Sequence, residues 1–415
     1  MAISNNEALH RISMLADLLP WQFEAVAEAV EPVEARKGTL IVERGSDDGY
    51  TYFLTEGEVS LEAADGVTTK VESNLDTVRT PVANLRPRIL GVTAMSRVRG
   101  LRIPDIVLTA AGCNGKRLKQ GMITDEDEDD AERREAESRL SFQIYRDLQS
   151  NKSILPSLPD LALRIRRAIE DDVSDARTVA RMVESDPAMA AKLLKAANSA
   201  MYGGMTTAET CSAAVVRLGM QTTKQLVLTF ALKEVFQTKN PMIRKRMQVL
   251  WKHSSQIAAL CFVLAREIKG ILAEEALLIG LLHDVGAIAI LNCIENYPDL
   301  ASDETSLEET ISRMRGELGA MILRKWMLPA PVVAGARDAE YWLRQHQGPA
   351  DFTDLLVVAQ VHERLRKDQL SGLPPLEKIS AFKRVLGEDA TPERSLQVLH
   401  DAKTQADEMR SVLRA

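Results

Sequence analysis

The first hundred residues change their pattern of apolar positions once. Apolar side chains recur at near-helical spacing between residues 8 and 31, which predicts short helices there. Residues 33–62 instead place glycines between short β-rich runs, a pattern typical of a small antiparallel barrel or sandwich. The runs predict strands at 39–42, 50–54 and 59–61, with further strands at 67–71, 92–94 and 101–108.

From residue 155 to the end, the apolar spacing is helical almost throughout. Three helix starts are indicated by a capping side chain just ahead of a proline, at Ser157, Asp186 and Thr391. Gly219 follows an apolar run and is predicted to end a helix. We therefore expect an all-α region behind the β-rich one.

An acidic run separates the two regions. Residues 125–130 read DEDEDD, and a block of like charges repels itself, so a solvated linker is expected. A docking site for a basic partner is the alternative. The predicted division is a β domain at 1–112, a linker and charged helix at 113–150, a helical domain at 151–345 and a helical extension at 346–415.

Composition narrows the class of protein. Apolar residues make up 45% of the 415 residues, which is enough for substantial cores, and the net charge of −7 gives no support for broad nucleic-acid binding. No cysteine pair has C-x-x-C spacing, so we expect reduced thiols in a cytoplasmic protein. The cysteines are Cys113, Cys211, Cys261 and Cys293.

Neither a signal sequence nor a membrane span is predicted. The N-terminus lacks a basic segment followed by an apolar one. The apolar stretch 257–265 ends at Arg266, and the stretch 276–291 carries His283 and Asp284 in its middle, so both are expected to be buried helices.

Residues 37–61, KGTLIVERGSDDGYTYFLTEGEVSL, resemble the cyclic-nucleotide-binding domain family, and the resemblance extends over about residues 8–110. It implies a jelly-roll β-barrel with flanking helices. The positions that match are Gly38, Gly45, Asp48, Gly49, Tyr52, Phe53, Leu54 and Gly57.

The phosphate-binding cassette of that family is only half present. Family members open it with Gly-Glu and close it with Pro-Arg, whose arginine pairs with the cyclic phosphate. Pro87 and Arg88 match the closing half, but residues 79–81 are Arg-Thr-Pro and contain no Gly-Glu. Arg88 is thus a weak candidate for a cofactor-binding remnant, and Arg86 and Arg88 are expected to be surface arginines. A fold retained for protein contact or dimerisation is favoured over nucleotide binding.

Residues 155–343 resemble the HDOD family, helical relatives of the HD phosphohydrolases. Matching stretches occur in order along the chain. They are LPSLPDLALRI, ESDPAMAAKLLKAANSAMYG from Glu184, AAVVRLG, HSSQIAALC from His253, GLLHDVGAIAI from Gly280, and LGAMILRKWMLP from Leu318. The resemblance implies an α+β multidomain protein with an N-terminal barrel and a C-terminal all-α HDOD domain.

The resemblance also implies a degenerate metal site. His253 matches the first histidine ligand of HD enzymes, and His283 with Asp284 matches the His-Asp pair. Arg315 and Gln360 occupy positions where related sequences carry a histidine and the final aspartate. Ala339 and Glu340 replace a histidine pair. His346 and His362 are conceivable substitutes without a supporting pattern.

A guanidinium carries no free lone pair for a metal and repels a divalent ion. We therefore expect no bound metal or other cofactor, and no catalytic residue. His253 and Asp284 are expected to approach each other, and Arg315 to fill the vacated space or pair with a carboxylate. Three ligands can still hold zinc in good geometry. Polar residues in the 184–203 stretch are read as helix caps and packing groups, or alternatively as an interaction surface; they are Glu184, Asp186, Asn198 and Ser199.

The favoured hypothesis is a cytoplasmic, non-enzymatic signalling adaptor that binds protein partners. Formation of a homodimer is compatible with this hypothesis. One alternative is a metal-dependent phosphohydrolase acting on a nucleotide or cyclic dinucleotide. The other is a cyclic-nucleotide receptor.

Overall fold

The structure is a computed structural model, and its contacts divide the chain into two compact units. The first comprises Met1–Leu155 and Cys293–Arg337, the second Pro156–Asn292 and Asp338–Ala415. Residues 5–414 are described except for 75–76, 85–87, 114–138, 140, 147–155, 157–158, 161–162, 165–175, 205, 347, 368, 370–371 and 388–391. The acidic run 125–130, Arg86, Ser157 and Thr391 lie outside the described residues.

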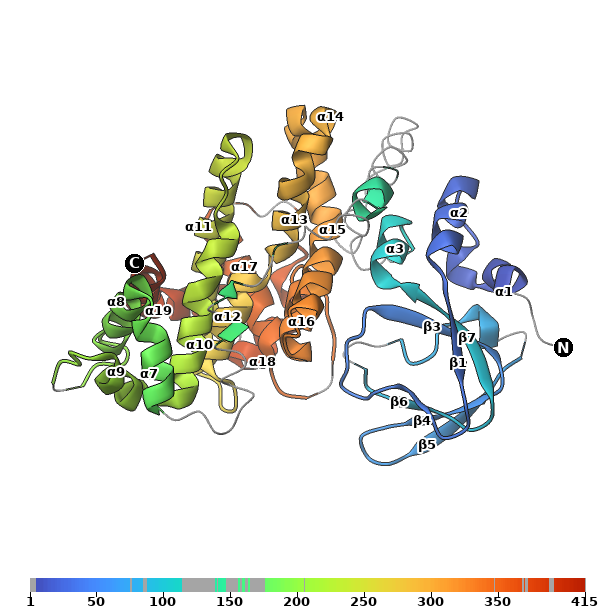
Figure 1. Cartoon of the computed structure of the whole chain (residues 1–415), viewed down its shortest axis with the longest axis horizontal. Coiled ribbons are helices and arrows are strands. Elements are labelled where there is room, and N and C mark those ends of the chain that lie inside the picture. Colours follow the sequence, from blue (N-terminus) through green and yellow to red (C-terminus); the bar gives the residue numbers. More distant parts are fainter. Residues whose placement is uncertain are drawn as a thin grey trace. The chain divides into compact units, whose positions relative to one another are not determined.

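The β region of the first unit consists of two open antiparallel sheets (Figure 1). One has the order β1 (Glu31–Ala35), β7 (Val98–Pro104), β3 (Tyr50–Glu56). The other has the order β2 (Leu40–Val42), β6 (Gly91–Ala94), β4 (Glu58–Glu62), β5 (Thr68–Glu72). No pairing among the described strands closes them into the single barrel that the sequence predicted.

Apolar side chains from both sheets form the core of this region, because alternate strand residues point inward. The buried members are Ala35, Val42, Leu54, Val59, Val92, Ala94 and Val98. In the turn between β3 and β4 the backbone needs Gly57, which has φ +95 and would place a Cβ 2.3 Å from the Arg97 carbonyl oxygen.

Two expected boundaries in this region are wrong. The helix predicted through residue 31 ends earlier, as α2 (Pro20–Ala29), and β1 begins at Glu31. The strand predicted over 101–108 ends at Pro104, after which α3 (Asp105–Ala110) begins. Proline lacks the N–H that a continuing ladder needs. The buried Asp105 also accepts a hydrogen bond from the Thr51 hydroxyl at 2.7 Å, which fixes this helix start against β3.

Helices from a distant part of the sequence complete the first unit. α1 (Asn5–Arg11) and α2 precede the strands, whereas α14 (Pro298–Ser302), α15 (Glu304–Lys325) and α16 (Ala330–Arg337) come from the region after residue 293. α15 packs against α3 and α16. Asp303 begins α15 as its cap, accepting from the Thr305 and Ser306 amides.

A buried ion cluster attaches α15 and α16 to the turn before β3. The Asp47 carboxylate is fully buried and accepts a hydrogen bond from Arg324 Nη2 at 2.5 Å. Arg337, the last residue of α16, donates to its other oxygen. Arg324 Nε also donates to the Asp47 carbonyl at 2.8 Å. The two guanidinium groups therefore hold the turn from both helices.

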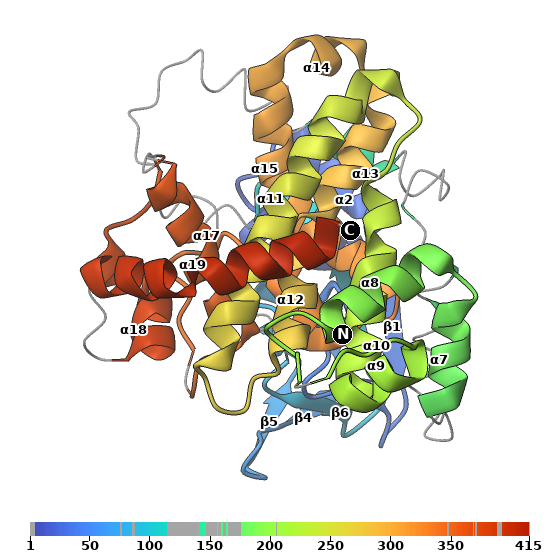
Figure 2. The ribbon, with the colours of Figure 1, turned by 90° about the vertical axis from the view of Figure 1, so that its left-hand side faces the viewer.

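The described residues of the second unit contain helices and no strand, as the sequence predicted. The helices are α7 (Ala176–Glu184), α8 (Pro187–Ala197), α9 (Cys211–Leu218), α10 (Met220–Ala231), α11 (Pro241–Arg266), α12 (Ala273–Leu282), α13 (Val285–Cys293), α17 (Phe352–Arg366), α18 (Ser380–Leu386) and α19 (Pro392–Arg414). The final residue of α13 belongs to the first unit. Figure 2 shows α19 lying across α11, and the two helices are in contact.

Local signals account for two of these boundaries. Asp186 caps α8 by accepting from the Ala188 and Met189 amides, as expected, and Pro187 is its first residue. Gly219 ends α9 with φ 78, a conformation that favours glycine. Asn198 ends α8, and its side chain donates to the Ala208 carbonyl at 2.9 Å, so it also holds the following loop.

The most apolar stretch of the chain is buried within the protein. Ala273–Cys293, with mean hydropathy 1.9, is long and apolar enough to cross a membrane by length and composition alone. It comprises α12 and α13, and 94% of its most apolar window is buried. The core helices of many proteins meet the same criterion, so this is weak evidence for a span. All four cysteines are free thiols, as expected.

Candidate functional site

Three of the predicted ligands meet between α11, α12 and α13. His253 projects from α11, His283 follows α12, and Asp284 precedes α13. The Nε2 atoms of the two histidines are 3.2 Å apart. Asp284 Oδ2 lies 3.5 Å from His253 Nε2 and 3.3 Å from His283 Nε2. The expected approach of His253 to Asp284 is thus present.

The close packing of α11 on α12 brings these side chains together. A Cβ on Gly280 would lie 2.6 Å from the Ala258 Cα, a separation that real Cβ atoms do not adopt. Glycine at 280 therefore permits the two backbones to approach. His283 and Asp284 are almost fully buried, whereas 27% of the His253 side chain is exposed, which leaves one side of the cluster open.

Hydrogen bonding sets the tautomer of His283. Its Nδ1 lies 2.8 Å from the Gly280 carbonyl oxygen, which can only accept, so Nδ1 carries the proton. In the neutral ring the Nε2 lone pair then faces His253 and Asp284. When no cation is bound, a proton on His253 Nε2 can be donated to the His283 Nε2 lone pair or to the Asp284 carboxylate.

The same arrangement fits three ligands of a small divalent cation. Around a tetrahedral ion with bonds of about 2.1 Å, ligand atoms are about 3.4 Å apart. The separations of 3.2, 3.3 and 3.5 Å in this cluster match that spacing. A histidine that ligates a metal usually donates its other ring N–H to a carbonyl or carboxylate, as His283 Nδ1 does to Gly280. His253 would have to release its Nε2 proton to the other ring nitrogen.

The residue at the position expected for the final aspartate is a glutamine that hydrogen-bonds to the backbone. Gln360 on α17 is buried, and its amide nitrogen donates to the Ala339 carbonyl. A glutamine can offer a metal only its neutral carbonyl oxygen, which lacks the charge of an aspartate carboxylate. Arg315 lies on α15 in the other compact unit, so its proximity to the cluster stays a prediction.

A second group of potential ligands surrounds the start of α17. His346, Asp351 and Asp354 lie within ligand-sharing distance of one another. Asp354 is fully buried and also accepts from Arg384 Nη2 at 2.7 Å and from Arg344 Nη1 at 3.1 Å. Two guanidinium charges beside the carboxylates oppose a divalent cation. We therefore interpret this group as a structural network that caps α17.

Burial and arginine act in opposite directions on Asp354. Burial alone would raise the pKa of its carboxyl. Hydrogen bonds from Arg384 and His346, with the charges of Arg344 and Arg384, outweigh burial and lower this pKa below its ordinary value. Sequence reasoning missed the network, although Asp351-x-x-Asp354 ahead of an apolar run has the spacing of a capping box.

Neither remaining histidine substitutes for a missing ligand in the part of the chain that the structure describes. His346 belongs to the network at α17. His362 is fully buried beside the Phe382 ring, and burial lowers its pKa to about 3. It belongs to neither group of clustered ligands.

Arg88, expected on the surface, is buried. Its side chain is fully covered, and Nη2 donates to Asp48 Oδ1 at 2.8 Å and to the Tyr50 carbonyl at 2.5 Å. Nη1 donates to the Ala83 carbonyl at 2.6 Å. The expectation failed because Asp48, a partner 40 residues away, cannot be recognised from local composition. The guanidinium ties two chain segments together.

The helical region that carries the histidine-aspartate cluster is similar to a known domain. Residues 155–340 match the model of the HDOD domain. The chain thus carries an HDOD domain over these residues, as the sequence indicated.

Three known proteins are similar to this chain over much of its length. An uncharacterized protein of Treponema pallidum (strain Nichols) is 26% identical over 272 residues, which cover 61% of this chain and about half, 51%, of that protein. A crystal structure named "Putative metal-dependent phosphohydrolase" from Shewanella amazonensis SB2B superposes with a TM-score of 0.57 at 23% identity, covering 67% of this chain and 99% of that one. A "Putative signal transduction protein" from Marinobacter aquaeolei VT8 covers 96% of this chain and 100% of its own, with 15% identity and a TM-score of 0.46. The likeness to the Shewanella structure concerns the fold alone.

Proposed function

We propose that this protein is a non-enzymatic regulatory protein of a cytoplasmic signalling pathway, whose HDOD domain acts by binding protein partners. The observation that carries the proposal is Gln360. An amide occupies the position of the final aspartate, and its nitrogen is committed to the Ala339 carbonyl. A hydrolytic centre must hold its metal and still leave a position for the attacking water. Because the final carboxylate ligand is missing, we interpret the cluster of His253, His283 and Asp284 as structural.

The second candidate is a metal-dependent phosphohydrolase. It is supported by the spacing of His253, His283 and Asp284, which suits three ligands of one divalent ion. Such an ion, when bound, would activate water and polarise a phosphoryl group. The protein's own contribution would be to orient the ligands, through the bond from His283 Nδ1 to the Gly280 carbonyl.

A metal titration separates the two candidates. We expect the purified protein to bind Mn²⁺ and Zn²⁺ weakly, and Gln360→Asp to bind at least about tenfold more tightly, since a carboxylate adds a ligand where the family places one; a tenfold change is about 1.4 kcal/mol. Asp284→Ala is the control and should abolish the gain. Stoichiometric metal in the purified wild-type protein that is lost in Asp284→Ala would support the hydrolase instead.

For the β region we propose a jelly-roll-like module related to cyclic-nucleotide-binding domains, used for protein contact or self-association. The burial of Arg88 supports this proposal, because its Nη1 and Nη2 atoms already donate to Ala83, Asp48 and Tyr50 and its side chain is fully covered. A homodimer and partner binding are both compatible with such a module. Membrane attachment and broad nucleic-acid binding are not part of the proposal.

Titration with cAMP and cGMP tests this assignment. At a hundredfold excess over Kd, a ligand specific for the folded state stabilises it by about 2.7 kcal/mol, which a melting curve detects. We expect no saturable rise in melting temperature with either nucleotide. A saturable rise would establish a receptor. Arg88→Ala is not a clean control, since removing a buried arginine destabilises the fold itself, so competition with a fluorescent nucleotide should accompany the melt.

A further inference from the structure

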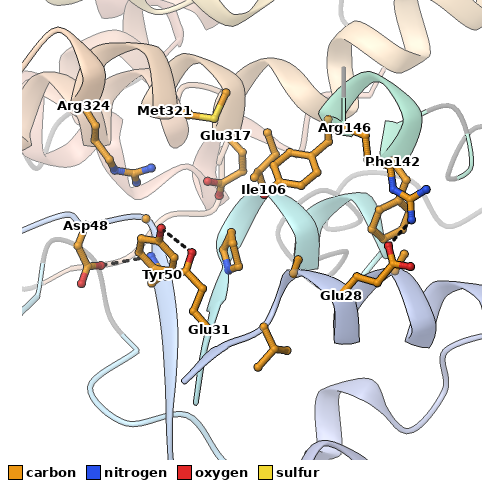
Figure 3. A pocket seen from close by; sticks show the side chains of 16 residues that line it. Glu28, Glu31, Asp48, Tyr50, Ile106, Phe142, Arg146, Glu317, Met321 and Arg324 are labelled. Carbon is orange, nitrogen blue, oxygen red and sulfur yellow. Dashed lines mark hydrogen bonds and ion pairs between the residues drawn. The ribbon is translucent and has the colours of Figure 1, made fainter. Parts of the chain in front are cut away.

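A pocket of about 500 Å³ lies within the first unit, whereas the histidine-aspartate cluster belongs to the second. Its walls come from α2, β1, β3, α3, residues 142–146 and α15 (Figure 3). All of these segments belong to one compact unit. The volume falls in the range of small-molecule sites, roughly 300–1,000 Å³.

One part of the wall is apolar and aromatic. Ile106 and Phe142 line it, and Met321 comes from α15 (Figure 3). Ala25, Ala29, Val30, Pro104 and Tyr145 complete this part. An apolar body of a ligand would lose its contact with water here, which favours binding by about 25 cal/mol per Å² of apolar surface.

The polar part of the wall consists mainly of acceptors. Glu28, Glu31, Asp48 and Glu317 contribute four carboxylates, against two guanidinium groups from Arg146 and Arg324. The Glu317 side chain reaches from α15 toward Tyr50, which itself donates to Glu31 (Figure 3). Each carboxylate oxygen can accept more than one hydrogen bond, so those already bound to an arginine still have capacity.

The two cations on the wall are already engaged. Arg146 Nη2 donates to Glu28 Oε2 at 2.5 Å, and Arg324 is bound to Asp47 through Nε and Nη2. An anionic ligand would have to compete with these pairs and approach the other carboxylates. Burial raises the pKa of the Tyr50 hydroxyl most; Glu31 and Asp48 raise it further, whereas Arg102, which is paired with Glu31, opposes them.

We propose that this pocket binds a small organic cation, a protonated amine carried on an apolar body. The ammonium group would donate to the carboxylates near Tyr50, and the apolar body would lie against Ile106, Phe142 and Met321. Aromatic faces on the wall add cation–π attraction. The ligand would give the proposed regulatory protein an input separate from the HDOD cluster, and the site does not depend on that function being correct.

Calorimetry on the full chain with three probes of similar size tests the proposal. They are 2-phenylethylamine, the neutral 2-phenylethanol and the anionic 3-phenylpropionate. We expect saturable binding of the amine, at least tenfold tighter than either analogue. Equal binding of the alcohol, tighter binding of the carboxylate, or no saturation by the amine overturns the proposal.

Two variants assign the binding to this pocket. Glu317→Gln should lower the affinity for the amine at least tenfold. Glu308→Gln, at an exposed position on the same helix, should leave this affinity unchanged. Met321→Trp should abolish binding by filling the cavity, and it tests the location if Glu317→Gln does not fold. Unchanged affinity in both Glu317→Gln and Met321→Trp would contradict the assignment.

Discussion

Individual buried carboxylates in this protein are held by arginines that are distant in sequence. Asp47 is bound by Arg324 and Arg337, which follow it by 277 and 290 residues. Sequence reasoning found the chemistry of the histidine-aspartate pair because His283 and Asp284 are adjacent. It did not find the arginine partners, because nothing in the local pattern marks an arginine as buried.

Asp354 provides a test at this scale. Its folded-state pKa is lowered, so its contribution to stability is present above the unfolded pKa, about 3.9, and is lost as pH falls through the folded value. We expect Asp354→Asn to lower the free energy of unfolding by about 3–5 kcal/mol at pH 7, since it leaves buried arginines without their carboxylate. The deficit relative to wild type should begin to shrink below about pH 4, where the carboxyl of the unfolded chain takes up a proton, and should disappear as pH falls through the lower folded-state pKa.

Urea unfolding between pH 3 and pH 7 measures this deficit. Asp407→Asn is a matched control, because Asp407 is exposed and pairs with Arg410 on its own helix. Exposed pairs contribute about 0–1 kcal/mol, so the control should be near neutral. An Asp354→Asn deficit independent of pH would show that the carboxylate charge is not its source.

At the scale of elements, helices with strong local signals were predicted well, and elements set by packing were not. Asp186 before Pro187, and Gly219 after an apolar run, fix the ends of α8 and α9 through local hydrogen bonds. β1 was missed because Glu31–Ala35 has a mixed pattern and is a strand only by pairing with β7. The expected jelly-roll barrel stays a prediction, because the described strands form two sheets that no pairing closes.

Gly280 tests the packing of α11 on α12. Gly280→Ala should destabilise the fold by about 1–3 kcal/mol, because its Cβ would lie 2.6 Å from the Ala258 Cα and one backbone must move. Gly204→Ala, where the nearest atom would be 3.7 Å away, is the control and should be nearly neutral. Denaturant midpoints compare the two. Equal midpoints would mean that the helices can separate without cost.

At the scale of the whole molecule, the sequence indicated the HDOD domain, and the contacts group segments that are distant in the chain. The matched residues 155–340 contribute to both compact units, because Cys293–Arg337 groups with the N-terminal region. The predicted domains were consecutive segments, because they were inferred from changes of composition along the chain. The grouping depends on contacts such as Arg337 with Asp47, which no local pattern marks.

The central claim is that the HDOD domain acts without hydrolysing a substrate. The most direct measurement is turnover of nucleotides and cyclic dinucleotides by the full chain with added Mn²⁺, Fe²⁺ or Mg²⁺, beside Asp284→Ala at equal concentration. The account predicts no turnover above the no-enzyme rate in either protein. Hydrolysis by the wild-type protein that disappears in a folded Asp284→Ala variant would contradict it and establish the histidine-aspartate cluster as a metal-dependent active site.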